Sequence, residues 1–189
     1  QAVGNSDYGY FCGGSGPNIS DMQRIDYASD TTTAAPKAYL SVASDAGACA
    51  GNSNYGYLAA GRAPSNVSTI DRIDYSNDNS SGSPRGPQNR STTFFGGAGN
   101  ENYGYWMGGY PSVSSVERTD YSNDTSVAAP KGLLSVPIDR CSGSSPRGLG
   151  LAQSYSSANI GNIGYGYFVG GNATKDIGPT TINSSTERI

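Results

Sequence analysis

The sequence predicts an all-β protein, and its composition, its turn residues and an internal repeat all support this. Glycine accounts for 27 of the 189 residues and tyrosine for 14, while charged residues make up 14%. Low charge combined with many aromatic side chains argues against intrinsic disorder. Abundant Gly, Ser, Asn and Pro favour frequent turns and therefore short strands. No stretch of Leu, Glu, Lys and Ala has helical spacing, so we do not expect long helices.

The repeat consists of three motifs in a fixed order. Tyr-Gly-Tyr comes first, followed by a bulky residue and then small ones. An Arg-Ile-Asp-Tyr motif follows, with Arg118-Thr119-Asp120-Tyr121 in its place in the third copy and only Arg188-Ile189 in the fourth. A Pro-Lys or Pro-Arg pair is the third motif. The framework residues of the repeat are Tyr8, Tyr10, Arg24, Tyr55, Tyr57, Arg72, Tyr103, Tyr105, Arg118, Tyr165, Tyr167 and Arg188.

The repeat spacing predicts one domain over residues 1–189. Tyr-Gly-Tyr begins at residues 8, 55, 103 and 165, so the periods are 47, 48 and 62 residues. The longer third period contains a 16-residue insertion between Pro130 and Pro146, which we interpret as a tolerated loop. The predicted repeats are approximately 1–47, 48–95, 96–157 and 158–189, with the last one truncated.

Each motif is typical of a strand or a turn. In Tyr-Gly-Tyr the two tyrosines lie on one face of a strand, and glycine and the bulky residue lie on the other. A glycine inside a strand that recurs in every copy indicates close approach by another backbone or ring. Ser-Asn-Asp after the second motif favours a turn. We therefore expect four small antiparallel sheets, each pairing a Tyr-Gly-Tyr strand with an Arg-Ile-Asp-Tyr-type strand.

These motifs resemble the kelch repeat. An aromatic strand, a Gly-Gly doublet such as Gly13-Gly14 and a strand ending in Asp-Tyr recur in the kelch pattern at a period near that seen here. The resemblance implies a β-propeller of about four short blades, and the alternative is an open β-repeat array or solenoid in a fibre. The tryptophan departs from the kelch pattern, because Trp106 lies in a different strand. The Tyr-Gly-Tyr and Arg-Ile-Asp-Tyr-Ser-Asn-Asp sequences are also similar to repeats of aquatic phage and environmental microbial surface proteins.

The residue types present favour a protein that is not an enzyme. The chain has no histidine, which excludes Ser-His and Cys-His pairs and the histidine ligands of kelch-related copper oxidases. We expect no cofactor. Aspartates recur at a spacing of four, at Asp26 and Asp30 and again in the next two repeats. They could bind calcium, but we favour turn-forming aspartates that include a strand-face partner for Arg24, Arg72 or Arg118.

Charge and hydropathy limit the partners that the chain could have. The net charge is −3 and lysine and arginine do not cluster, so nucleic-acid binding is not expected. No apolar run approaches the roughly 20 residues of a membrane span. Cys12, Cys49 and Cys141 lack the close spacing of a zinc site, and either three buried thiols or one disulfide and one thiol fit the sequence.

Two sets of side chains are candidates for a surface role. Tyrosines outside the repeated positions are candidates for exposed contacts, whereas we expect most Tyr-Gly-Tyr tyrosines in the core. These surface tyrosines are Tyr39, Tyr110 and Tyr155. Asn-X-Ser/Thr sequons are candidate glycosylation sites, with simple turn formation as the alternative. The sequon asparagines are Asn18, Asn66, Asn79, Asn89, Asn123, Asn172 and Asn183.

Together these features predict a structural subunit of an extracellular or virion-surface fibre or filament, with other copies of itself as partners. Tandem repetition, low charge and the missing catalytic groups motivate this interpretation. A carbohydrate- or receptor-binding propeller, such as a phage adhesin, is the alternative. We also expect the truncated fourth repeat to leave an open sheet edge for an adjacent copy to cover, and the alternative is a fragment of a longer protein whose next repeat follows Ile189.

Overall fold

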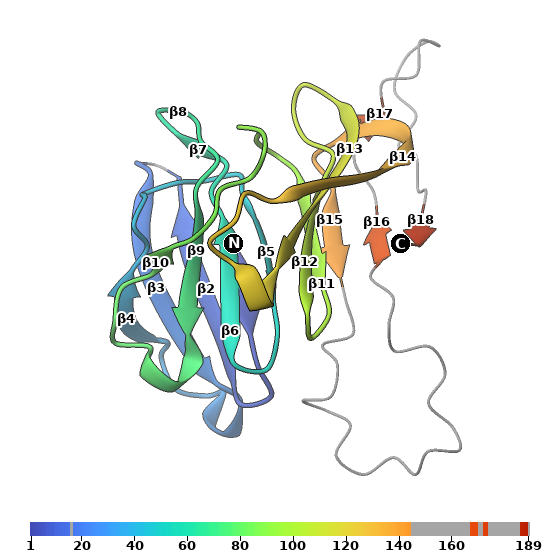
Figure 1. The fold of residues 1–189 in the computed structure, drawn as a ribbon. Coiled ribbons are helices and arrows are strands. Elements are labelled where there is room, and N and C mark those ends of the chain that lie inside the picture. The colour runs from blue at the N-terminus through green and yellow to red at the C-terminus, as the bar shows by residue number, and fades with distance from the viewer. Residues whose placement is uncertain (16, 145–166, 170–171, 174–185, 189) are drawn as a thin grey trace, which may run out of the picture.

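The computed structural model describes residues 1–15, 17–144, 167–169, 172–173 and 186–188, and these form an all-β protein (Figure 1). Their strands form four antiparallel sheets and one two-stranded ribbon. The helical segments among them are three 3-10 turns of three residues each. In this part of the chain no helix is long and apolar enough to be a candidate membrane span.

The first two sheets each contain four strands and one 3-10 turn. The first sheet has the order β1 (Ala2–Gly4), β2 (Tyr8–Gly14), β3 (Ile19–Asp26), β4 (Ala35–Tyr39), with turn η1 (Tyr27–Ser29). The second has the order β10 (Ser83–Pro84), β9 (Ile70–Asp74), β6 (Tyr55–Ala59), β5 (Ala48–Gly51), with turn η2 (Tyr75–Asn77). The ribbon consists of β7 (Arg62–Ala63) and β8 (Ser65–Asn66).

The third and fourth sheets follow the same plan with differences at their outer strands. The third has the order β11 (Gly96–Gly99), β12 (Tyr103–Met107), β13 (Val113–Asp120), β14 (Ala129–Asp139), β17 (Asn172–Ala173), with turn η3 (Tyr121–Asn123). The fourth has the order β15 (Ser142–Ser144), β16 (Tyr167–Val169), β18 (Thr186–Arg188).

The predicted strand pairing is confirmed in all four sheets. A Tyr-Gly-Tyr strand lies beside an arginine-bearing strand in each, as β2–β3, β6–β9, β12–β13 and β16–β18. The register is also identical, because the second tyrosine is always opposite the arginine of the partner strand. These pairs are Tyr10↔Arg24, Tyr57↔Arg72, Tyr105↔Arg118 and Tyr167↔Arg188. One framework residue, Tyr165, lies outside the described residues.

The insertion in the third repeat does not form the predicted loop in its described part. Residues 129–139 form the single long strand β14, and Ser142–Ser144 then begins the fourth sheet. Leu134 and Ile138 of β14 are buried, and Val136 between them packs against the same cluster. These alternate apolar residues give the segment the period of two that a half-buried strand needs. The repeat spacing does not indicate this strand, because spacing reports only the length of the insertion and not its apolar alternation.

The sheets are arranged in a series, with their first strands next to one another. β1 contacts β5, β5 contacts β11, and β11 contacts β15. A pocket of about 300 Å³ is lined by residues of all four sheets, among them Ala2, Cys49, Gly97 and Gly143. Each sheet therefore packs against the next one through the strand that comes first in its sequence.

The hydrophobic core lies between successive sheets. Tyr10 and Met22 of the first sheet pack with Leu58 and Ile73 of the second. Tyr57 and Ile70 of the second sheet form a like cluster with Phe95 and Trp106. A third cluster joins Met107, Val116 and Leu134 to Cys141. Within the described residues the hydrophobic core is therefore divided among three clusters at successive sheet-to-sheet contacts.

A tyrosine ring lies against the glycine of each described Tyr-Gly-Tyr strand, which confirms the predicted close approach. A Cβ atom at Gly9 would be 2.7 Å from the Tyr27 hydroxyl oxygen. The corresponding distance is 2.9 Å both from Gly56 to Tyr75 and from Gly104 to Tyr121. Real Cβ atoms do not approach so closely, so a side chain at this position would have to displace the tyrosine ring.

We predict that Gly104→Val is severely destabilising. The new side chain would meet the Tyr121 hydroxyl and the Ala50 methyl, which is 3.3 Å from the ideal Cβ position. Overpacking of this kind costs about 1–3 kcal/mol or more, and thermal melting followed by circular dichroism measures it. Gly132→Val is the matched control, because no atom lies within 4 Å of that Cβ position. Equal melting temperatures for the two variants would contradict the close-approach argument.

Candidate functional site

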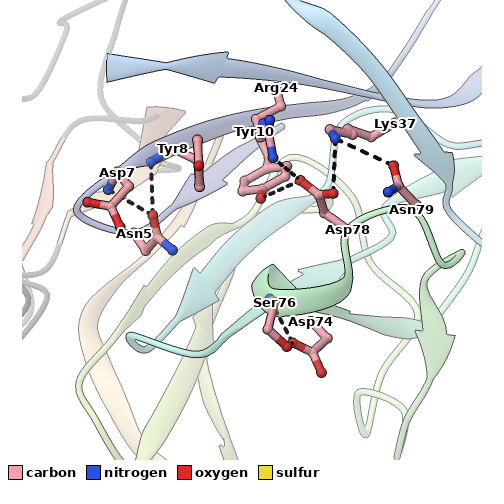
Figure 2. Close-up of polar contacts among 10 residues, drawn as sticks. All are labelled: Asn5, Asp7, Tyr8, Tyr10, Arg24, Lys37, Asp74, Ser76, Asp78 and Asn79. Carbon is pink, nitrogen blue, oxygen red and sulfur yellow. Dashed lines mark hydrogen bonds and ion pairs between the residues drawn. The ribbon is translucent and has the colours of Figure 1, made fainter. Parts of the chain in front are cut away.

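A buried carboxylate of the second sheet binds three side chains of the first. Asp78 Oδ2 accepts hydrogen bonds from the Tyr10 hydroxyl at 2.9 Å and from Arg24 Nη1 at 2.7 Å. Lys37 Nζ lies 3.1 Å from Asp78 Oδ1 and also donates to Asn79. Figure 2 shows the three donors converging on this one carboxylate. We call this group the first inter-sheet site.

The second inter-sheet site repeats this arrangement between the second and third sheets. Asp124 Oδ2 accepts hydrogen bonds from the Tyr57 hydroxyl at 2.9 Å and from Arg72 Nη1 at 2.8 Å. Arg85, which occupies the position of Lys37, places its Nε 3.5 Å from the same oxygen. Each site therefore takes a tyrosine, an arginine and a post-proline basic residue from one sheet and an aspartate from the next.

Backbone contacts accompany the side chains at both sites. The Gly86 N–H donates to the Asp124 carbonyl at 2.7 Å, and the Ala38 N–H donates more weakly to the Asp78 carbonyl at 3.5 Å. A Cβ atom at Gly86 would overlap the Ser126 carbonyl. The outer strand of one sheet thus lies directly against the turn of the following sheet.

Local sequence explains why the aspartate points to the neighbouring sheet. Asp74 caps turn η2, with its side chain accepting from the Ser76 N–H at 2.9 Å, and Asp120 caps η3 in the same way. The cap fixes a tight turn that ends at Asp78 or Asp124. The aspartates at a spacing of four therefore have two separate roles, one local and one between sheets.

These contacts show which partners the aspartates have within the described residues. Arginine and lysine already neutralise Asp78, and the capping aspartates face their own turns. Within the described residues no group of three acidic or cysteine side chains could hold a metal ion. The expected aspartate–arginine pairing is present, but the partner of Arg24 lies one repeat further along the chain.

Burial and charge both shift the acid–base equilibria of the first site. Burial alone would raise the pKa of Asp78, but hydrogen bonds from Lys37, Tyr10 and Arg24 outweigh it, so the pKa of this carboxyl lies below its usual value. Burial, followed by the hydrogen bond to Asp78, raises the pKa of the Tyr10 phenol. The site therefore holds a carboxylate, a neutral phenol and a guanidinium at neutral pH.

Aromatic stacking adds to both sites. The Tyr10 ring stacks on Tyr75 of the next sheet with centroids 5.3 Å apart, and Tyr57 stacks on Tyr121 at 4.4 Å. Arg24 lies over the ring of Tyr8 in its own sheet at 4.1 Å. This cation–π contact holds the guanidinium in place for the carboxylate of the next sheet.

The third sheet carries the same donors. Arg118 lies over the Tyr103 ring at 4.1 Å, as Arg24 does over Tyr8, and Lys131 occupies the position of Lys37. Tyr105 is half-buried, whereas Tyr10 and Tyr57 are fully buried. Among the six Tyr-Gly-Tyr tyrosines whose burial is described, only Tyr10 and Tyr57 are fully buried, so the prediction that most of them lie in the core is confirmed for these two alone.

The predicted surface tyrosines are exposed where the structure describes them. Tyr39 is 56% exposed and Tyr110 is 50% exposed, and Tyr155 lies outside the described residues. Arg140 lies 5.6 Å from the Tyr110 ring and 5.2 Å from that of Phe94. No sequence pattern indicates this cluster, because its members come from separate loops.

The sequon asparagines differ in exposure. Asn66, Asn79, Asn89 and Asn123 are exposed. Asn18 is half-buried and donates to the Arg62 carbonyl at 3.0 Å. The side chain of Asn172 and the whole of Asn183 lie outside what the structure describes. Four of the sequons are therefore accessible to a modifying enzyme.

No disulfide bond joins the three cysteines in the structure. Cys12 and Cys141 are buried, and Cys49 is half-buried. Burial raises the pKa of the Cys12 thiol to about 12. At neutral pH this thiol is protonated and serves as a small apolar core residue.

Comparison of the sequence with protein-family models gave no match. Comparison with curated proteins also gave no match. A function for the chain must therefore be argued from its own residues and their geometry.

We predict that Asp78→Asn lowers stability in a pH-dependent way. The pKa of Asp78 is lower in the folded state than in the unfolded chain. Its contribution is therefore complete above the unfolded-state pKa of about 3.9 and is lost as pH falls through the folded-state value. The variant should lose about 3 kcal/mol at neutral pH, and this difference should shrink in acid.

Urea unfolding at a series of pH values measures this effect. Asp30→Asn is the matched control, because Asp30 occupies the same position in the first repeat and is exposed. Its unfolding should follow the wild type at every pH when measured on dilute protein. A pH-independent loss in Asp78→Asn would show that the carboxylate charge is not what holds the site together.

Proposed function

We propose that the chain is a non-enzymatic structural subunit of an extracellular or virion-surface fibre or filament. One observation carries this proposal: the same set of side chains joins the first sheet to the second and the second to the third. A connection whose two halves are both present in each of the first three repeats can also be made between chains. Head-to-tail contacts of this kind give filaments when they do not close into a ring.

The chemistry of the repeated residues supports this role. Asp78 and Asp124 are buried and bonded to basic side chains. The repeated tyrosines contact the next sheet through their hydroxyls and rings. The recurring polar groups therefore bind one another between sheets. The exposed sequons lie on the surface, where an extracellular protein could carry glycans.

A kelch-like β-propeller is the proposed arrangement of the four sheets. The serial contacts of β1, β5, β11 and β15, and the pocket that all four sheets line, support a radial arrangement around one axis. An open array of the same sheets is the alternative, and it would suit a fibre directly.

The proposal predicts concentration-dependent self-association of the purified chain. Sedimentation and electron microscopy should show elongated particles whose length increases with protein concentration. A folded chain that remains monomeric at high concentration, with no higher-order particles, would contradict the structural role.

A carbohydrate- or receptor-binding module is the second candidate, and the surface around Tyr110 favours it. An exposed tyrosine beside Arg140 offers a flat ring for stacking and a cation for hydrogen bonding. A glycan array tests this candidate, with Tyr110→Ala expected to abolish binding and Tyr39→Ala to retain it. An array without any binding would remove this candidate.

A further inference from the structure

Three equivalent turns hold a residue other than glycine in the left-handed backbone region. Ala46, Phe94 and Arg140 have φ values of 54°, 55° and 50°. Each lies two positions before the first strand of its sheet, β5, β11 or β15. The Phe94 N–H donates to the Ala46 carbonyl at 2.7 Å, and the Arg140 N–H donates to the Phe94 carbonyl at 2.7 Å. The fold therefore uses this backbone conformation in three successive repeats.

Glycine would fit such a turn with the least strain. A side chain in the left-handed region is strained, and a bulky one such as that of Phe94 especially so. Packing in the core does not offset this strain, because Phe94 is half-buried and belongs to none of the three described hydrophobic clusters. Its neighbour Phe95, by contrast, is 3% exposed and lies in the second cluster. Local strain without a packing role is typical of a functional site.

Two arginines flank the Phe94 ring. The guanidinium carbon of Arg62 lies 5.8 Å from the ring centroid and that of Arg140 lies 5.2 Å from it. Arg140 is also 5.6 Å from the ring of Tyr110, which is 50% exposed. The framework contact of Arg118 with its ring is closer, at 4.1 Å. We call Arg62, Phe94, Tyr110 and Arg140 the aromatic–arginine cluster.

The cluster does not follow the repeat. Arg62 and Tyr110 occupy equivalent positions, since each pairs with the residue just before a left-handed turn, as Asp45↔Arg62 and Thr93↔Tyr110. The framework keeps its tyrosines and arginines from repeat to repeat, whereas this position holds arginine in one repeat and tyrosine in the next. The requirements of the repeated fold therefore do not explain the side chains of the cluster.

Two buried carboxylates balance the charge of the cluster. Arg62 donates to Asp45 from Nε at 2.9 Å and from Nη2 at 2.6 Å. Arg140 Nη1 lies 3.3 Å from each carboxylate oxygen of Asp139. The aspartates are buried, while the two arginine side chains are about half exposed and keep further N–H donors. The formal charges of these four groups cancel.

We propose that the aromatic–arginine cluster binds a neutral saccharide. The rings of Phe94 and Tyr110 stack on the apolar C–H face of a sugar, and Arg62 and Arg140 donate to its hydroxyl oxygens. The balanced charge favours a neutral sugar over a sulfated or carboxylated one. This site rests on the carbohydrate-binding candidate, adds Arg62 and Phe94 to it and specifies its ligand class.

Glycine substitutions separate binding from folding. Phe94→Gly and Arg140→Gly each remove a cluster side chain and relieve a strained turn, so both variants should melt at the wild-type temperature or above it. The neutral oligosaccharide that the wild type binds best on a glycan array serves as the probe in isothermal titration calorimetry. Each variant should bind it at least about tenfold more weakly, as expected when a central contact is truncated.

Ala46→Gly is the matched control. It relieves the equivalent turn and removes only a methyl group outside the cluster. This variant should also melt at the wild-type temperature or above it, but it should bind the oligosaccharide with wild-type affinity. Weaker binding by Ala46→Gly would show that the turns and not the side chains determine affinity, and would overturn the proposed site.

The other outcomes distinguish this site from the proposed functions. A lower melting temperature in Phe94→Gly would show that the ring serves the fold, and would overturn the site. Binding that Tyr110→Ala weakens and neither glycine variant changes would also overturn it, and would leave the carbohydrate candidate at Tyr110. Binding of sulfated or carboxylated glycans alone would contradict the neutral ligand. An array without any binding would overturn both the site and that candidate, and would leave the assembly role, which sedimentation tests separately.

Discussion

The structure depends on a carboxylate that one sheet contributes to the face of the sheet before it. Asp78 and Asp124 are almost completely buried, and a buried charge is stable only when it is paired and hydrogen-bonded. Each receives a phenol, a guanidinium and a second cation from one neighbouring sheet. The aspartate can therefore be buried only when the two sheets are correctly aligned. The position of each sheet is thus coupled to that of the next.

The tyrosines and glycines of the repeat serve the same connection. The second tyrosine of Tyr-Gly-Tyr both donates to the aspartate and stacks on the tyrosine of the following turn, as Tyr57 does with Asp124 and Tyr121. That second ring also lies over the glycine of its own sheet, Gly104, where a side chain would displace it. Substitution at the glycine would thus disturb the ring, and through the ring the contact between the sheets.

Much of the fold could be predicted from the period and the alternation of residues. The all-β class, the strand pairing and the ring over the glycine all follow from local spacing, which a single sequence contains. The partner of Arg24 could not be predicted, because Asp30 and Asp78 occupy identical positions in successive repeats and only the three-dimensional arrangement distinguishes them. The cluster of Phe94, Tyr110 and Arg140 was missed for a similar reason, since loops distant in sequence bring it together.

A double-mutant cycle between Arg72 and Asp124 tests the central claim most directly. The free energy of unfolding is measured by urea denaturation for the wild type, Arg72→Gln, Asp124→Asn and the double variant. If the aspartate joins the sheets, the two substitutions are not additive, and their coupling energy is at least about 1 kcal/mol. Additive effects within about 0.3 kcal/mol would mean that the two residues act independently, and the account of how the sheets are joined would be wrong.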